Sequence, residues 1–155
     1  MEERFMREAL KQAKKAAGLG EMPVGAVIVR GDEIISRAYN RRETKKNAIM
    51  HAEIAAIEKA CKKLGGWRLP GCSIYVTLEP CPMCAGAILN ARIENLFFGA
   101  YDKRSGCAGS VLDLLDMNLC NYRVPVIGGI LEEECSDIIK KFFRQLRAEK
   151  SKMQY

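Results

Sequence analysis

The sequence has few of the features that mark membrane, secreted or fibrous proteins. Its longest stretch without a charged residue runs only from Pro80 to Ala91, whereas a transmembrane helix needs roughly 20 apolar residues. The first residues, Met1 to Arg7, carry charges where a secretory signal has an apolar core. There is no internal repeat and no low-complexity segment. We therefore expect no membrane association and a cytoplasmic location.

What the chain does contain is typical of one globular domain. It has 155 residues, of which 48% are hydrophobic and 28% charged, which is enough to bury a core without disulfides or metals as staples. We expect a single domain over residues 1–155. The net charge of +6 suits a nucleic-acid binder, but many ordinary enzymes share it.

Histidine is nearly absent, with one residue, while cysteine occurs seven times. An odd number of cysteines without an export signal favours a reducing compartment, where thiols pack or bind metal instead of forming disulfides. Cys61, Cys72 and Cys135 stand isolated in the chain, and we interpret them as small buried residues.

The pattern of apolar residues predicts strands and helices in a definite order. A helix over residues 2–17 precedes a hairpin of two strands, and helices and strands then alternate. This order predicts an α/β fold, a three-layer α-β-α domain with a central mixed five-stranded sheet whose later strands are parallel. The expected strands cover residues 24–29, 34–39, 73–77, 95–98 and 124–127, and the later helices residues 51–64, 82–91, 111–117 and 132–150. The last helix is expected to bury Ile138, Ile139, Phe142, Phe143 and Leu146, and Pro125 suggests that the last strand is an edge.

Two short motifs carry the chemistry. The only histidine, His51, is followed two positions later by Glu53, and Cys81 and Cys84 lie three positions apart at the start of a predicted helix. Residues three apart on a helix point the same way, so the two thiolates can share a metal ion. His51 can join them only if it lies at the entry of its own helix, because residues two apart within a helix diverge. Three protein ligands leave a position for water, as in catalytic zinc sites.

Glu53 is not needed as a ligand and is the candidate for moving protons between that water and a substrate. A structural zinc site remains an alternative, with Cys107 or Cys120 as a fourth ligand.

With H-x-E and P-C-x-x-C, the chain resembles the zinc-dependent cytidine/deoxycytidylate deaminase superfamily, and within it the bacterial tRNA adenosine deaminases. The resemblance spans nearly the whole chain. It also includes Asn40, eleven residues before His51, the stretches beginning at Pro23 and Thr77, the loop from Asp102 to Ser110 and the segment Phe142-Phe-Arg. Asn121-Tyr122-Arg123 departs from the Asn-His-Arg that is usual there, although a tyrosine can still stack or donate a hydrogen bond.

The resemblance implies a cytidine-deaminase-like fold and hydrolytic deamination of the wobble adenosine of a tRNA to inosine. It implies one Zn²⁺ per subunit held by His51, Cys81 and Cys84, with Glu53 as the proton shuttle for a zinc-activated water. The implied partners are a tRNA anticodon stem-loop and a second copy of the chain in a homodimer. The implied substrate contacts are Asn40, Val24, Ala52, Asp102 and Arg144.

Three alternatives stay open from the sequence. The enzyme could instead deaminate a free base or nucleoside, such as guanine, cytosine or cytidine. The chain could also be a non-catalytic RNA-binding module that zinc stabilises. The basic residues around Arg144 end a helix that begins with acidic ones, so compensation of the helix dipole explains them as well as RNA contact does.

Overall fold

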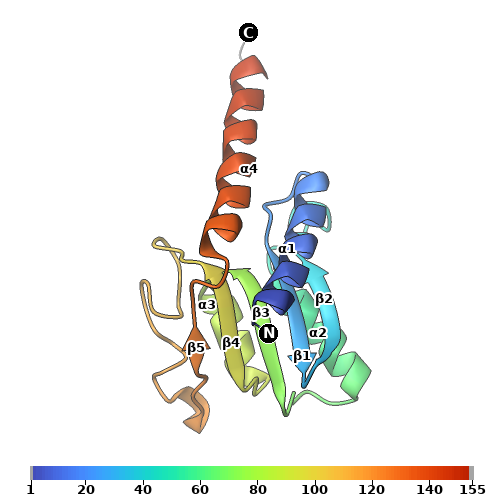
Figure 1. Ribbon diagram of the computed structural model, residues 1–155, viewed down its shortest axis with the longest axis vertical. Coiled ribbons are helices and arrows are strands. Elements are labelled where there is room, and N and C mark those ends of the chain that lie inside the picture. The colour runs from blue at the N-terminus through green and yellow to red at the C-terminus, as the bar shows by residue number, and fades with distance from the viewer. Residues whose placement is uncertain (1, 154–155) are drawn as a thin grey trace.

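The computed structural model describes residues 2–153 and has a five-stranded mixed sheet at its centre. The sheet order is β2-β1-β3-β4-β5 (Figure 1). β1 pairs antiparallel with both β2 and β3, while β3, β4 and β5 run parallel. β5 is therefore an edge strand, as Pro125 predicts. The strands are β1 (Gly25–Arg30), β2 (Glu33–Tyr39), β3 (Cys72–Leu78), β4 (Asn95–Ala100) and β5 (Val126–Ile127).

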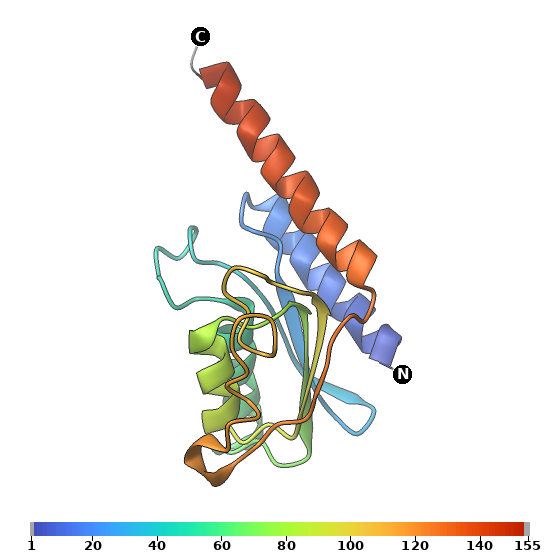
Figure 2. The ribbon, with the colours of Figure 1, turned by 90° about the vertical axis from the view of Figure 1, so that its left-hand side faces the viewer.

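Helices cover both faces of the sheet, which confirms the three-layer α/β fold. On one face lie α1 (Glu2–Gly18) and the start of α4 (Glu132–Met153). On the other face lie α2 (Ala52–Leu64) and α3 (Pro82–Asn90), and Figure 2 shows the sheet edge-on between the two pairs.

The alternation of side chains along the strands builds a separate core on each face. In β1, Ile28 packs with α2 and α3, while its neighbour Val27 packs with α1. In β3, Ile74 and Tyr75 divide in the same way. Because successive side chains of a strand point to opposite faces, a nearly continuous apolar strand fills both cores at once.

The parallel strands decide where a site can form. β3 ends at Leu78, and α3 begins at Pro82, only a few residues later. α2 also begins near the carboxyl ends of these strands, because the segment between β2 and α2 stays at that end of the sheet (Figures 1 and 2). In open α/β sheets, ligands bind outside the carboxyl ends of the parallel strands, and the predicted metal ligands lie there.

The prediction of a helix over residues 111–117 is wrong. These residues form turns, and Ala108 makes an isolated β-bridge with Asp113. Their backbone bonds go back to the preceding loop, from the Val111 N–H to the Gly106 carbonyl and from the Leu114 N–H to the Cys107 carbonyl. The loop contacts thus replace the bonds that a helix would need.

The expected burial along α4 is wrong beyond Ile138, which packs half-buried against the core beside α1. Within α4 only Cys135 is buried, and Phe143 remains 38% exposed. The reason is length, because the helix runs well past the edge of the sheet and has no layer to pack against there (Figures 1 and 2).

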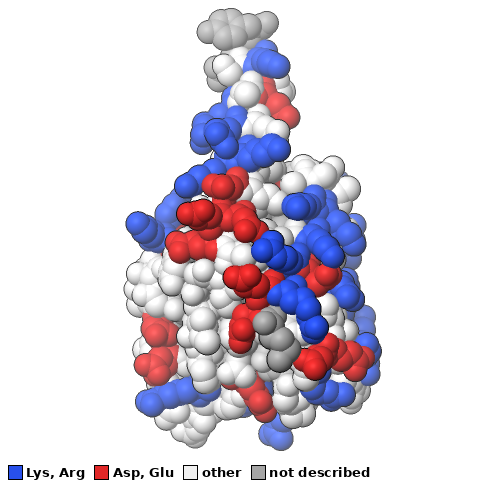
Figure 3. All heavy atoms as spheres, in the orientation of Figure 1, with Lys and Arg blue, Asp and Glu red and all other residues white. Residues whose placement is uncertain are grey.

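Charge is distributed unevenly along α4. Its first turn is acidic and its last turn is basic, and the projecting part shows mostly basic side chains (Figure 3). Arg7 of α1 forms an ion pair with Glu134 at 3.2 Å, which ties the start of α4 to the body of the protein. No helix within residues 2–153 combines the length and apolar character needed to cross a membrane.

Candidate active site

His51 lies at the entry of its helix, as its spacing to Glu53 requires. It is the N-cap residue of α2 and has extended backbone angles, φ −76° and ψ 159°. Its side chain therefore leaves the chain before the helical geometry begins, and Nδ1 faces the two cysteine sulfurs. Because His51 is not yet helical, its side chain and that of Glu53 can reach the same site although they are only two residues apart.

The two cysteines lie at the start of α3. Cys81 is its N-cap, with φ −73° and ψ 174°, and Pro82 occupies the first helical turn. Proline suits this position because its missing N–H would have no helical partner there. Cys84 follows within the same turn and is fully buried. Two helix N-termini thus meet at one point.

The three side chains form a group that fits a metal ion. The His51 Nδ1 atom lies 3.7 Å from Cys81 Sγ and 3.5 Å from Cys84 Sγ, and all three donor atoms are within 4.8 Å of one another. A tetrahedral zinc ion separates a nitrogen and a sulfur ligand by about 3.5 Å, so the observed distances agree with that geometry.

A three-ligand set is typical of catalytic zinc sites. Within residues 2–153, neither Cys107 nor Cys120 belongs to the group, which argues against the structural four-ligand alternative. Cys72 and Cys135 are buried, as predicted, and Cys61 is partly exposed.

The environment of Cys81 favours a thiolate. Hydrogen bonding with Cys84 is the main cause that lowers the pKa of the Cys81 thiol to about 4, and His51 adds to the effect. The positive end of a helix dipole acts in the same direction. Cys81 therefore offers a charged sulfur to a cation at neutral pH.

Glu53 is a buried acid beside the metal-ligand group. Its side chain is 4% exposed, and burial raises its pKa to about 6. A carboxyl group with a pKa near the working pH can both accept and return a proton. This is the property that a proton shuttle needs.

A cavity of about 800 Å³ opens over this group. Four of the five predicted substrate contacts, Val24, Asn40, Ala52 and Asp102, line it together with His51, Glu53 and Cys81. The basic residues at its rim come from the loops on both sides and from α4: Arg42, Lys103, Arg104 and Lys140.

Asn40 is held firmly at the cavity wall. Its Nδ2 donates to the Met22 carbonyl at 3.2 Å, and its Oδ1 accepts the Arg42 N–H at 3.2 Å. A side-chain amide has two donors and two acceptor positions. One of each thus remains for a substrate.

Asp102 organises its own loop. Its Oδ1 accepts the N–H groups of Arg104 and Ser105, and its Oδ2 accepts the Ser105 hydroxyl. Both oxygens are therefore engaged locally, although a carboxylate can accept more than these three bonds.

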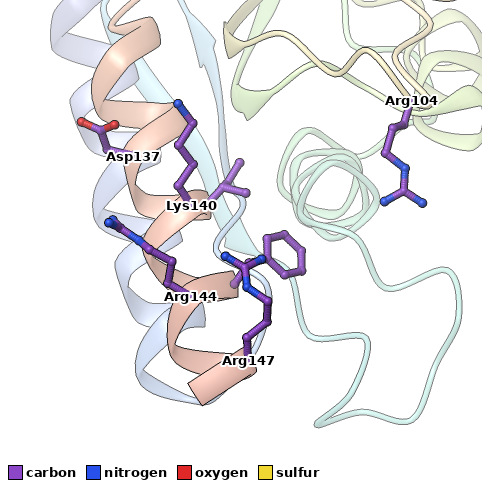
Figure 4. Close-up of a pocket in the computed structure, with 7 residues that line it drawn as sticks. Arg104, Asp137, Lys140, Arg144 and Arg147 are labelled. Carbon is purple, nitrogen blue, oxygen red and sulfur yellow. The ribbon is translucent and has the colours of Figure 1, made fainter. Parts of the chain in front are cut away.

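Arg144 lies outside the main cavity, in a neighbouring hollow of about 650 Å³ between α4 and the loop of Arg104. Figure 4 shows Arg144 and Arg147 on α4 and Arg104 across the gap. Arg104 and Phe143 line both the hollow and the cavity, so the two lie side by side.

Tyr122 lies elsewhere. Its hydroxyl contacts the carbonyls of Arg92 and Ile93 at 3.2 and 3.0 Å, and the Arg92 guanidinium lies 5.5 Å from the centre of its ring. It does not line the cavity, so this departure from the family pattern serves local packing.

Two buried glutamates were missed by the sequence reasoning. Glu79 accepts hydrogen bonds from the 101–110 loop, and Glu21 accepts the N–H groups of Glu43 and Thr44 at 3.0 and 2.7 Å. The available signal was their place, because Glu79 directly follows β3 and Glu21 lies shortly before the apolar strand β1. A buried charge in such a place must have hydrogen-bond partners.

Comparisons with known proteins agree with this geometry. The family described as MafB19-like deaminase matches residues 1–147. The tRNA-specific adenosine deaminase of Bacillus subtilis (strain 168) is 52% identical over 96% of this chain and 92% of its own. That of Aquifex aeolicus (strain VF5) is 46% identical over 94% of this chain and 95% of its own.

Solved structures show the same relationship. A tRNA:A34 deaminase, studied for A-to-I editing at the wobble position of transfer RNA, superposes with a TM-score of 0.84, at 42% identity over 87% of this chain and 98% of its own. The guanine deaminase of Bacillus subtilis superposes at 0.61, with 44% identity over 64% of each chain. The chain belongs to the tRNA-specific adenosine deaminases of the cytidine/deoxycytidylate deaminase superfamily.

Proposed function

We propose that this protein, as one domain over residues 1–155, hydrolyses the wobble adenosine of a tRNA to inosine, releasing ammonia. The observation that carries the proposal is the group of His51, Cys81 and Cys84 beside the buried Glu53, at the base of a cavity with a basic rim. The similarity to the tRNA-specific adenosine deaminases of Bacillus subtilis and Aquifex aeolicus supports the same reaction and substrate.

We infer that the metal is zinc. Two thiolates and an imidazole are soft and borderline ligands that favour zinc in a tetrahedral site. When bound, zinc would supply a water whose pKa is lowered toward neutrality.

Glu53 transfers the protons in this proposal. It takes one proton from the attacking water and passes it to the purine nitrogen next to carbon 6. It then takes the second proton from the new hydroxyl group on carbon 6 and passes it to the amino group, which leaves as ammonia while the carbonyl forms. Its burial raises its pKa, so the carboxyl group holds a proton long enough to deliver it. Because Glu53 is buried, bulk solvent does not compete for this proton.

The remaining residues bind the RNA. Asn40 holds the purine edge with its free donor and acceptor, Val24 packs against the base, and Ala52 lines the pocket beside His51. Asp102, which lines the same cavity, accepts a ribose hydroxyl in this proposal. Arg144 and its basic neighbours face the adjoining hollow (Figure 4), where phosphates of the anticodon loop would be neutralised.

We further propose a homodimer in the cytoplasm. Several large apolar side chains are 40–58% exposed, and four of them lie in the short segment 111–119, where a second copy of the chain would cover them: Ile49, Val111, Leu112, Met117 and Leu119. All seven cysteines are free, which suits a reducing compartment. Light scattering on the purified protein measures the mass and tests the dimer.

The function is tested by incubating the purified protein with an anticodon stem-loop RNA and sequencing the product. Inosine at the wobble position alone is the expected result. Turnover of free guanine, cytosine or cytidine without turnover of the RNA would contradict the proposal and favour the alternative that the guanine deaminase similarity suggests.

The mechanism is tested with Glu53→Gln. This variant keeps the shape of the side chain but cannot accept the proton, so inosine formation falls by about 10²-fold or more. Zinc content and RNA affinity stay near those of the wild type. Undiminished activity would remove Glu53 from the mechanism. If Glu53→Gln failed to bind zinc, Glu53→Ala would be tested in its place.

A further inference from the structure

Glu79 is a buried carboxylate that the proposed chemistry does not use. It is 2% exposed and lies at the end of β3, two residues before Cys81. It lines the cavity, yet the metal-ligand group does not include it. A buried charge is costly unless its oxygens are hydrogen-bonded, so its partners indicate its role.

All side-chain partners of Glu79 come from one loop, residues 101–110. Oε1 accepts the Asp102 N–H at 3.1 Å, and Oε2 accepts the N–H groups of Ala108 and Ser110 at 3.1 and 3.0 Å. The Ser110 hydroxyl donates to Oε1 as well. One side chain thus binds the loop at its beginning and at its end.

The loop is shaped to receive this carboxylate. A Cβ atom on Gly106 would lie 2.4 Å from the Asp102 carbonyl oxygen and 2.4 Å from Cδ of Glu79. Such a contact is far shorter than real Cβ atoms allow, so only glycine fits between the carboxylate and the loop backbone. This steric requirement is independent of the hydrogen bonds and indicates the same contact.

The bound loop contributes five residues to the lining of the cavity, and three of them are charged. Asp102, Lys103 and Arg104 all line it, and Asp102 receives its position directly through its own N–H bond to Glu79. We propose that Glu79 is the positioning residue of the RNA site, which fixes the 101–110 loop so that these three side chains meet the polynucleotide. It acts through them and takes no part in proton transfer.

This inference rests on the proposed function for its kinetic consequence. Glu79→Gln keeps the shape of the side chain but replaces one acceptor oxygen with an NH₂ group, which cannot accept the backbone N–H groups. The loop therefore loses part of its hydrogen bonds to residue 79. We expect KM for the anticodon stem-loop RNA to rise about tenfold, while kcat changes less than about threefold, because Glu53 and the metal ligands are untouched. Zinc content stays at the wild-type value.

Glu94→Gln is the matched control. Glu94 also anchors a loop, since its Oε1 accepts the Gly71 N–H at 3.0 Å. It lies just before β4, however, at the end of the sheet opposite to the cavity. Its substitution leaves KM and kcat unchanged. Ser110→Ala, which removes only the hydroxyl bond to Glu79, provides a milder variant and raises KM by a smaller factor.

Hydrogen exchange tests the positioning without relying on activity. In Glu79→Gln the amides of residues 102–110 exchange faster, while those of α3 keep their protection. An unchanged exchange rate in this loop, an unchanged KM, or a parallel loss of kcat and zinc would each overturn the inference. Failure of the wild type to deaminate RNA would overturn the proposed function instead, while the exchange result would still judge the role of Glu79.

Discussion

Each of the two loops that flank the cavity is held by hydrogen bonds to one buried glutamate, but the number of these bonds differs. The 41–50 loop follows β2, and two of its N–H groups donate to Glu21, which is fully buried. The 101–110 loop follows β4, and three of its N–H groups and a hydroxyl donate to Glu79. Residues 106–108 of the second loop are buried, whereas residues 42–46 of the first are exposed.

This difference suggests different roles for the two loops in substrate binding. The 101–110 loop is buried at residues 106–108 and holds its shape before a substrate arrives, which lowers the cost of binding. The 41–50 loop has fewer buried contacts, so it opens locally at a lower free energy. We therefore expect the 101–110 loop to fix the position of the substrate and the 41–50 loop to adapt to it.

The sharpest test of this comparison is removal of each carboxylate. Each buried N–H group that loses its partner costs about 1–3 kcal/mol. Glu79→Ala strands three amides and is expected to lower the free energy of unfolding by about 4 kcal/mol, and Glu21→Ala, which strands two, by about 2 kcal/mol. Urea unfolding followed by circular dichroism measures both. A larger loss at Glu21 would reverse the comparison.

The close packing of the 101–110 loop predicts the next largest effect. Gly106→Ala forces a Cβ against Asp102 and Glu79 and is expected to cost about 2 kcal/mol. Gly66→Ala is the control, because its Cβ would meet open space, and its effect stays within about 0.5 kcal/mol. Equal thermal stability of the two variants would show that the loop accommodates the added methyl group.

The basic residues of the two loops should contribute unequally to RNA affinity. Arg104 lines both the cavity and the hollow beside α4, so Lys103→Ala with Arg104→Ala weakens binding about tenfold, or about 1.4 kcal/mol. Arg42→Ala with Lys45→Ala weakens it less. Binding measured over a range of salt concentrations should also lose about 0.7 of logarithmic slope for each phosphate contact removed.

Lys62→Ala with Lys63→Ala is the control for that experiment. Both lysines lie on the exposed side of α2 and pair with Glu58 and Glu33. Substituting them leaves the affinity and its salt dependence unchanged. An equal loss from all three double variants would mean that net charge alone attracts the RNA.

The smallest effect is a pH dependence at Glu21. Burial by itself raises the pKa of this group, but hydrogen bonds from Thr44 and Glu43 outweigh it, so the pKa lies below its ordinary value of 4.5. A folded-state pKa below the unfolded one stabilises the protein above pH 4.5, and this stabilisation is lost as the pH falls through the folded value. The difference in unfolding free energy between wild type and Glu21→Gln should shrink below pH 4.5. A difference that grows on acidification would contradict this sign.

Much of the fold and the centre of the site were accessible from the sequence. Alternation along strands such as Val27–Ile28 and the spacing of apolar residues in α1 are local patterns, and local patterns are set by backbone geometry. The metal ligands were accessible for a similar reason, since Cys81 and Cys84 share one turn, and the spacing of His51 and Glu53 demands a helix entry.

The errors occurred where the outcome depends on distant parts of the chain. Residues 111–117 have an apolar pattern that favours a helix, but the loop before them takes their backbone bonds. The apolar residues of α4 follow a helical period, yet the sheet ends before the helix does. Periodicity shows which face of a helix is apolar, and only the surrounding layers decide whether that face is covered.

The sequence by itself therefore determined the chemistry, which is a histidine, two cysteines and a glutamate at spacings that can bind a metal and move a proton. The tertiary structure alone decided how the substrate side is held. Glu79 meets Asp102, Ala108 and Ser110 across more than twenty positions of sequence, and Glu21 meets its loop in the same way. A carboxylate carries no sequence signal for the amides it will accept, because those amides come together only when the chain has folded.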